Sequence, residues 1–173
     1  MPDSHHKSRR QRDAWLRLEP ARLLEQCREE RYRASGPGGQ RRNKVETAVR
    51  LRHVPSGVVS QAEEARSLAE NRKRAVRRLR ERIALNCRMP FDLAEPSLPP
   101  EFVEHRRGGS LAINQHNQSY PLVVATVLDA LVAAKGSYAR AAGALSLTTS
   151  QLVRFLEADR EVWRMVETVR QIK

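Results

Sequence analysis

The chain has 173 residues, with 32 Lys plus Arg against 20 Asp plus Glu, which gives a formal charge of +12. Hydrophobic residues make up 40% of it and charged residues 30%, so the sequence predicts a folded core and excludes disorder throughout. The longest apolar run, residues 122–132, is far shorter than the roughly 20 residues that cross a bilayer, so we expect no membrane-spanning protein.

The sequence contains two cysteines and five histidines, whose positions indicate the redox state of the protein's surroundings and whether a metal site is to be expected. Cys27 and Cys87 stand far apart, and no apolar segment near residue 1 resembles a secretory signal, so we expect a reducing, cytoplasmic setting. Neither cysteine has a second cysteine or a histidine at ligand spacing, and the histidines form no cluster. We therefore expect no metal site and no cofactor.

The excess charge belongs to one half of the chain. Residues 1–90 hold 23 basic and 11 acidic side chains, whereas residues 91–173 hold nine of each. A basic surface attracts a polyanion through Coulomb steering and counterion release, and nucleic acid is the commonest such partner. An anionic membrane is the alternative, but it favours a helix with bulky apolar residues opposite its cations, which is not the pattern here.

The first half predicts a short helix, a sheet and a long helix. Residues 20–27 are typical of a helix, and residues 29–34 of an extended segment that leads into a loop at residues 35–40. Residues 45–61 predict an antiparallel hairpin, because apolar side chains alternate and a Pro-Ser-Gly turn follows. From Glu63 onward, apolar residues recur every three or four positions, which predicts a helix of about 24 residues.

This long helix carries cations on its other faces. A charge run is usually only a solvated helix face, and that interpretation stays open on patterning alone. Eight cations against Glu70 and Glu81 favour contact with an RNA backbone instead. The eight are Arg66, Arg72, Lys73, Arg74, Arg77, Arg78, Arg80 and Arg82.

The loop at residues 35–40 has the sequence Ser-Gly-Pro-Gly-Gly-Gln. Two adjacent glycines, Gly38 and Gly39, admit backbone torsions closed to other residues and can present Gln40 at a tip. A glutamine amide donates and accepts hydrogen bonds but does not titrate near neutral pH. Gln40 can therefore orient a water, and its backbone N–H can face developing negative charge, but it cannot act as a general base.

Residues 33–51 resemble the GGQ loop of the class I peptide chain release factors and of the related codon-independent ribosome rescue hydrolases. The match includes Asn43, Lys44 and Glu46, and it continues into the hairpin and through the Glu-Asn-Arg stretch at residues 70–72. It covers roughly residues 27–85 and keeps the family's order of strand, loop, hairpin and basic helix. An ordinary polar turn beside an unrelated hairpin is the alternative interpretation.

The resemblance implies a ribosome-dependent peptidyl-tRNA hydrolase that cleaves the ester between nascent peptide and transfer RNA in the peptidyl-transferase centre. Gly38 and Gly39 would shape the loop, and Gln40 would coordinate the attacking water while its backbone N–H stabilises the transition state. In the family a dedicated methyltransferase modifies this glutamine, so the resemblance also implies methylation of Gln40. Contacts to RNA would come from Arg33, Arg41, Arg42, Asn43, Lys44, Arg50, Arg72, Lys73, Arg74, Arg77, Arg78 and Arg80.

Four features of the sequence depart from the family pattern. Arg41 and the pair Leu68-Ala69 replace a histidine and a Gln-His pair that are common in the family. Only 39 residues precede Gln40, so no stop-codon-reading domain fits there, and we expect release that does not depend on a codon. Residues 91–173 do not resemble the strongly basic tail with which small rescue hydrolases enter the messenger channel.

The second half predicts a small helical module. Residues 121–134 are typical of a helix that Gly136 ends, and residues 161–170 of a last helix. Between them, Ser137 is expected to cap a helix through residue 145, and Thr148 or Thr149 to cap another.

These two middle helices resemble the helix-turn-helix of bacterial DNA-binding regulators, with Ser146 at the usual glycine position. Residues 138–159 have no net charge, and phosphate neutralisation dominates nucleic-acid affinity. We therefore favour a docking or packing role over DNA reading, with Phe155 and Trp163 in the core.

Together these features predict an α+β protein with a small antiparallel sheet, a GGQ loop and a long basic helix, followed by a small all-α helix-turn-helix-like module. The expected domains are a flexible basic N-terminus at 1–19, the release-factor-like catalytic domain at 20–89, a proline-rich linker at 90–109 and the helical module at 110–173. The expected partners are large-subunit ribosomal RNA, peptidyl-tRNA and a glutamine methyltransferase, with no membrane. A non-catalytic ribosome- or RNA-binding factor is the alternative function, followed by a DNA-binding regulator.

Overall fold

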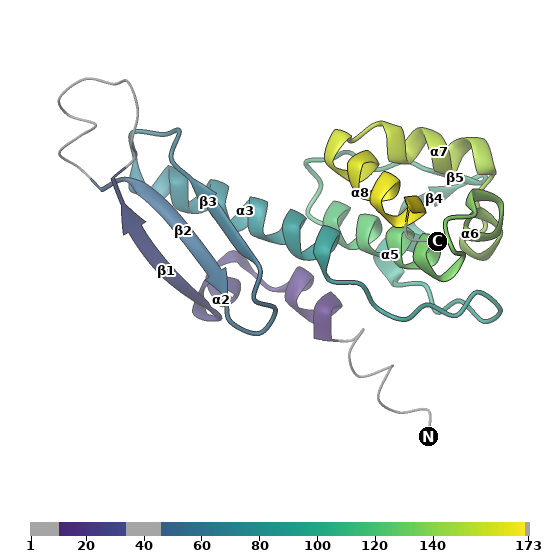
Figure 1. Cartoon of the computed structure of the whole chain (residues 1–173), viewed down its shortest axis with the longest axis horizontal. Coiled ribbons are helices and arrows are strands. Elements are labelled where there is room, and N and C mark those ends of the chain that lie inside the picture. Colours follow the sequence, from purple (N-terminus) through teal and green to yellow (C-terminus); the bar gives the residue numbers. More distant parts are fainter. Residues whose placement is uncertain (1–10, 34–45, 172–173) are drawn as a thin grey trace. The chain divides into compact units, whose positions relative to one another are not determined.

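The computed structural model describes residues 11–33 and 46–171 of the chain (Figure 1). The chain divides into unit 1, which comprises residues 1–17 and 87–173, and unit 2, which comprises residues 18–86. A small antiparallel sheet with a long helix in unit 2 and a set of helices in unit 1 confirm the predicted α+β class. None of the helices in the described part of the chain combines the length and apolar character that crossing a membrane requires.

Unit 2 is a three-stranded sheet packed against a helix. The strand order is β1-β2-β3 with both pairs antiparallel, and α3 packs against β2 and β3. The predicted hairpin is therefore confirmed, and Gly57 in its turn adopts a left-handed φ of 70°, which favours glycine. The elements are α2 (Pro20–Glu25), β1 (Cys27–Tyr32), β2 (Ala48–His53), β3 (Val59–Ala62) and α3 (Leu68–Asn86).

The core of unit 2 lies between the sheet and α3. Apolar side chains from both layers are fully buried, and each such burial contributes about 1.5–3 kcal/mol for a residue of leucine size. The helical spacing of the α3 residues turns one stripe of the helix toward the sheet. The buried residues are Ala48, Val49, Leu51 and Ala62 from the sheet and Ala75, Leu79 and Ile83 from α3.

The start of α3 differs from the prediction. The sequence pattern predicts a helix from Glu63, but the helix begins at Leu68. Asn71 accounts for the difference, because its side chain accepts from Ala65 N and donates to Ala65 O, both at 2.9 Å. A side chain that binds both backbone groups of Ala65 holds the chain there in a turn rather than in a helix.

Arginines of α3 bind the β3 edge of the sheet. Arg78 Nη1 donates to the Gln61 carbonyl at 2.8 Å, and Arg82 Nη1 donates to the Val59 carbonyl at 2.7 Å. The two arginines lie one helical turn apart and the two carbonyls lie two residues apart on β3, so the spacing of the helix matches that of the strand.

Unit 1 is built around α5, whose residues 122–131 are all buried. This run is therefore the central helix of a domain, which explains why it is apolar apart from Thr126 and Asp129. The other elements are α4 (Pro100–His105), β4 (Arg106–Arg107), β5 (Ser110–Leu111), α5 (Tyr120–Ala133), α6 (Tyr138–Leu145), α7 (Thr149–Glu157) and α8 (Arg160–Gln171).

A buried charge cluster ties distant segments of unit 1 together. Arg12 Nη1 lies 2.6 Å from Asp129 Oδ2, and Arg88 Nη1 lies 3.1 Å from Asp129 Oδ1. Burial raises the pKa of Asp129, against the opposing effect of the two arginines, and burial lowers the pKa of Arg88 to about 10. Removing one partner of such a cluster would leave a buried charge uncompensated, which costs about 3–5 kcal/mol.

This cluster gives structure to a segment that the sequence predicts to be flexible. Residues 11–17 are helical and Arg12 is fully buried, whereas the predicted flexible N-terminus extends to residue 19. Residues 1–10 lie outside the described residues. The predicted linker at 90–109 likewise contains α4 and β4, and Arg17 binds Glu101 of α4 through two hydrogen bonds.

The predicted caps of the second half are confirmed. Ser137 Oγ accepts from Arg140 N at the start of α6, and Thr148 Oγ1 accepts from Gln151 N at the start of α7. Ser146, in the turn between the two helices, has a left-handed φ of 54°. The chain therefore uses serine in a conformation for which glycine is the usual residue.

Candidate functional site

The segment with the diglycine sequence connects two neighbouring strands. Tyr32 at the end of β1 pairs with Ala48 at the start of β2, so residues 33–47 link the paired ends of two antiparallel strands. Residues 34–45 lie outside the described residues, and the predictions for them stay predictions. This applies to Gly38, Gly39, Gln40, Arg41, Arg42, Asn43 and Lys44.

The residues that flank this segment contact one another. Arg33 Nε lies 3.6 Å from Glu46 Oε1, an exposed pair on either side of residues 34–45. The guanidinium of Arg50 lies 5.7 Å from the centre of the Tyr32 ring, and the Tyr32 hydroxyl donates to Glu63 Oε2 at 3.1 Å. Burial, aided by the bond to Glu63, raises the pKa of Tyr32, so this hydroxyl stays protonated and remains a donor.

Asn71 binds the end of the connection that leads into β2. Its side chain is buried, and Nδ2 donates to the carbonyl of Thr47 at 2.7 Å. The same amide binds Ala65 through both its nitrogen and its oxygen. One side chain of α3 therefore fixes the residue that precedes β2 to the turn that precedes α3.

Arg72 binds the strand that leads into the connection. Its Nε and Nη2 donate to the two carboxylate oxygens of Glu29 on β1 at 2.8 and 2.7 Å, which is a bidentate pair. The bond to Arg72 lowers the pKa of Glu29, and Arg31 lowers it further. Since Asn71 and Arg72 are neighbours, two consecutive residues of α3 hold both strands that border residues 34–45.

Ion pairs and hydrogen bonds join the described residues at the base of this connection. Glu29, Glu46 and Glu63 are each bound to an arginine or a tyrosine, so the carboxylates at the base of the connection already have partners.

The cations predicted to contact RNA fall into separate groups. Lys73 and Arg77 are exposed and lie one turn apart on the outer face of α3. Arg74 pairs with Glu70 at 3.2 Å and Arg77 with Glu81 at 3.7 Å, and exposed pairs of this kind contribute only about 0–1 kcal/mol. An incoming phosphate can therefore displace these carboxylates at little cost.

Other predicted RNA contacts have structural partners. Arg50 lies 3.7 Å from Glu30, and Arg78 is bound to the Gln61 carbonyl and to Glu64 at 2.6 Å. Arg72 is held by Glu29, as described above.

Arg80 is buried, which is at odds with the predicted RNA contact. It donates to the Leu18 carbonyl, and burial lowers its pKa. The physical reason is the helical period, because Arg80 falls on the same stripe of α3 as Val76 and Ile83.

Sequence reasoning missed Glu29 and Thr47 as parts of the site. Glu29 lies 43 residues from Arg72 and Thr47 lies 24 residues from Asn71, so no local pattern marks either contact. The resemblance did include the Glu-Asn-Arg stretch at residues 70–72, and the structure shows what the last two of these residues bind.

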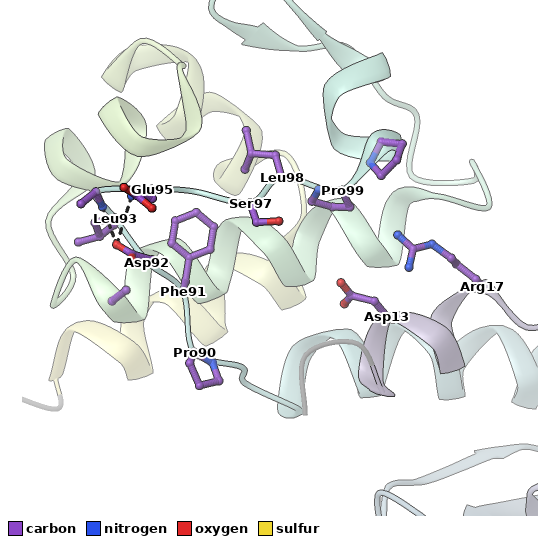
Figure 2. A pocket seen from close by; sticks show the side chains of 13 residues that line it. Asp13, Arg17, Pro90, Phe91, Asp92, Leu93, Glu95, Ser97, Leu98 and Pro99 are labelled. Carbon is purple, nitrogen blue, oxygen red and sulfur yellow. Dashed lines mark hydrogen bonds between the residues drawn. The ribbon is translucent and has the colours of Figure 1, made fainter. Parts of the chain in front are cut away.

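Unit 1 contains a cavity of about 1120 Å³ beneath residues 90–100 (Figure 2). Asp13 and Arg17 of the helix at 11–17 border it, opposite Phe91 and Leu98. Three of its polar side chains have partners: Arg17 binds Glu101, Asp13 Oδ1 accepts from Arg12, and Asp92 Oδ1 accepts two backbone N–H groups of its own loop. We assign no catalytic group to this cavity.

Comparison with known proteins places the similarity in unit 2 and the segment after it. Residues 23–95 match the family model described as the RF-1 domain. Peptide chain release factor 1 of Chloroherpeton thalassium is 56% identical over 52 residues, which are 30% of this chain and 14% of that protein. Peptide chain release factor 2 of Acidovorax sp. (strain JS42) is 52% identical over 56 residues, 32% of this chain and 15% of that protein.

The similarity to a shorter relative covers a larger share of that relative's length. The mitochondrial translation release factor in rescue of Danio rerio is 51% identical over 59 residues, which are 34% of this chain and 38% of that protein. The chain thus covers about one seventh of the two bacterial release factors and just over a third of the rescue factor.

Proposed function

Residues 23–95 belong to the class I peptide chain release factor family, and from this premise we propose that the protein releases nascent peptides on the ribosome by hydrolysing the peptidyl-tRNA ester. The observation that carries the proposal is the base of the connection between β1 and β2. Asn71 and Arg72 hold β1 and β2, the two strands that border the Gly38-Gly39-Gln40 segment. Held in this way, the paired strands form a stiff stem, and this stem presents the segment to a partner.

The roles of the segment follow from the chemistry of its residues. Gly38 and Gly39 let the backbone approach the ester closely, and the Gln40 amide orients the attacking water. The Gln40 backbone N–H donates toward the oxygen on which negative charge develops. The chain supplies no general base here, so proton transfer falls to groups of the ribosome and the transfer RNA. Methylation of Gln40 by a glutamine methyltransferase belongs to the same proposal.

Release is proposed to be independent of a codon. One feature supports this: the similarity covers a larger share of the rescue factor than of the two bacterial release factors. Binding to ribosomal and transfer RNA is assigned to Arg33, Arg50, Lys73, Arg74 and Arg77, together with Arg41, Arg42, Asn43 and Lys44 of the connecting segment.

The test uses ribosomes that carry labelled peptidyl-tRNA and an empty decoding site. Wild-type protein is expected to release the peptide, and Gln40→Ala to lower the rate by about 100-fold or more, the usual cost of losing one group that stabilises the transition state. Gln61→Ala is the matched control, because Gln61 is an exposed glutamine of the same unit. Equal release by Gln40→Ala and wild type would overturn the proposal.

A second arm separates the codon requirement from the chemistry. Release at an empty site that equals release at a stop codon is the expected result, and dependence on the stop codon would contradict codon-independent action. Tight ribosome binding by wild type without any release would instead support the non-catalytic binding factor.

A further inference from the structure

The cations and acids of unit 1 occupy separate stretches of the chain. Residues 106–156 hold one acid, Asp129, which is buried between Arg12 and Arg88. The other acids of residues 87–171 lie at 92–104 and 157–167. Apart from this buried acid, the charged side chains of residues 106–156 are all cations: Arg106, Arg107, Lys135, Arg140 and Arg154.

The fold brings the β4–β5 hairpin against the start of α7. Thr148 N donates to the Gly109 carbonyl at 2.9 Å, and a Cβ on Gly109 would lie 3.2 Å from the Thr148 methyl group, so the two backbones approach closely. Arg106 Nη1 donates to the Leu145 carbonyl at the end of α6. Arg107, two residues before Gly109, is thereby held next to the turn between α6 and α7.

The outer face of α7 adds to this surface. Ser150 and Arg154 are exposed and one turn apart, while Leu152, Phe155 and Leu156 on the other face are buried. Glu157, the last residue of α7, is also exposed and lies about 4.5 Å further along the helix than Arg154.

The acid that follows α7 is already bound. Asp159 Oδ2 accepts from the Tyr120 hydroxyl at 3.0 Å, and Asp159 Oδ1 accepts from Glu161 N at 2.9 Å. A charge count over residues 138–159 includes Glu157 and Asp159 but omits the hairpin, and this is why the sequence alone predicts a neutral module.

The arginines of this surface differ in their partners from four other arginines of the unit. Arg12, Arg17, Arg88 and Arg164 each lie within salt-bridge distance of a carboxylate. Across the described residues of the chain, no carboxylate lies within that distance of Arg107, Arg140 or Arg154. Exposed cations that form no ion pair attract phosphates, whose bound counterions are released on contact.

We propose that this hairpin–helix surface, defined as Arg107, Ser150 and Arg154, binds the phosphate backbone of an RNA helix. Arginine and short hydroxyl side chains contact phosphate and sugar oxygens, which gives binding that depends on shape rather than on sequence. We choose RNA over DNA because the proposed function puts the protein on the ribosome. The choice of nucleic acid therefore rests on the proposed function. The contact is distinct from hydrolysis and involves neither Gln40 nor α3.

The test measures binding of the full chain to an RNA duplex of about 16 base pairs over a series of salt concentrations. The variant Arg107→Gln/Arg154→Gln is compared with Arg160→Gln/Arg164→Gln, which removes the same charge from α8. Both pairs are made in a Lys73→Gln/Arg77→Gln background, so that α3 does not mask the effect.

Loss of two phosphate contacts is expected to reduce the slope of log K against log salt by about 1.5–2 and the affinity at 0.1 M salt by about tenfold. The α8 pair is expected to stay within about twofold of its background. Arg107→Lys/Arg154→Lys keeps both charges and should restore the binding, which separates a lost contact from a lost fold.

Two results would overturn the proposal. Equal weakening by the two glutamine pairs would mean that only net charge matters, and tighter binding of a DNA duplex of the same sequence would make the surface a DNA-binding one. Gln40→Ala should bind the RNA duplex as wild type does, so a failure of peptide release leaves the result of this experiment unaffected.

Discussion

The Asn71 amide nitrogen lies 2.7 Å from the Thr47 carbonyl, and this bond joins α3 to the residue that precedes β2. The neighbouring Arg72 joins the same helix to β1 through Glu29. The sequence predicts that α3 contacts RNA through its cations. The structure gives α3 a second role, because it also holds the stem on which the proposed chemistry depends.

Replacing Asn71 should therefore weaken both stability and function. Asn71→Ala removes three hydrogen bonds from a buried site, and we expect it to lower the free energy of unfolding by about 2–3 kcal/mol. At a temperature where the variant is still folded, peptide release should fall about tenfold or more, because the stem is less well positioned. Denaturant unfolding and the release assay measure the two effects.

Asn86→Ala is the matched control for this prediction. Asn86 is an exposed asparagine of the same helix and binds only the Arg82 carbonyl, at 2.8 Å, among the contacts described. Its loss should change stability by less than about 0.5 kcal/mol. Similar destabilisation by the two variants would contradict the assigned role of Asn71.

The stability of unit 2 should fall as the pH drops below about 6.5. His53 is buried, with Nδ1 2.7 Å from Ser56 Oγ and Nε2 3.1 Å from Gln26 Oε1, and burial lowers its pKa. Below the unfolded-state pKa the unfolded chain binds a proton that the folded chain does not, so the free energy of unfolding decreases; above it there is no effect.

His53→Gln should flatten this dependence between about pH 7 and pH 5, as measured by urea unfolding at each pH. His116→Gln, which removes an exposed imidazole, should keep the wild-type slope. The prediction fails if the His53 variant loses stability with acid as steeply as wild type does.

Cys27 should be unreactive at ordinary pH. Its thiol donates to the Leu23 carbonyl at 3.1 Å, and burial raises the pKa of Cys27 to about 11. The thiolate fraction at pH 8 is then about two orders of magnitude below that of a free cysteine. In a Cys87→Ala background, alkylation by iodoacetamide should be slower by about that factor than alkylation of the same sample in denaturant, and equal rates would refute the assignment.

Ser146→Gly should stabilise unit 1 by about 0.5–1 kcal/mol. Ser146 is exposed and left-handed, so glycine relieves backbone strain and removes no buried contact. Ser150→Gly is the control, because Ser150 lies in the first turn of α7, where glycine should destabilise the helix. Thermal unfolding of both variants tests the prediction, and destabilisation by Ser146→Gly would count against the strained turn.

Local patterns predicted much of the fold. The hairpin and the caps at Ser137 and Thr148 depend on residues within a few positions of one another, so the sequence displays them directly. Burial of Phe155 is likewise confirmed, whereas Trp163 is only half-buried. The helix spacing in these segments decides which face turns inward.

Long-range contacts account for what the sequence did not predict. The helix at 11–17 depends on the bond of Arg12 to Asp129, 117 residues away, and α4 is joined to that helix by Arg17, 84 residues before Glu101. In the site, the charge of Arg80 suggested a surface position that its place on the buried stripe of α3 rules out. Composition alone does not reveal which arginines already have a partner.

The arginines bound to β3 bear on how the protein behaves at high concentration. An edge strand offers a row of open carbonyls to which a strand from another molecule can add, and this is a common route to aggregation. Here Arg78 and Arg82 occupy the Gln61 and Val59 carbonyls with charged donors. An incoming strand would have to displace both guanidinium groups and meet their charge, so this edge of the sheet is protected against intermolecular pairing.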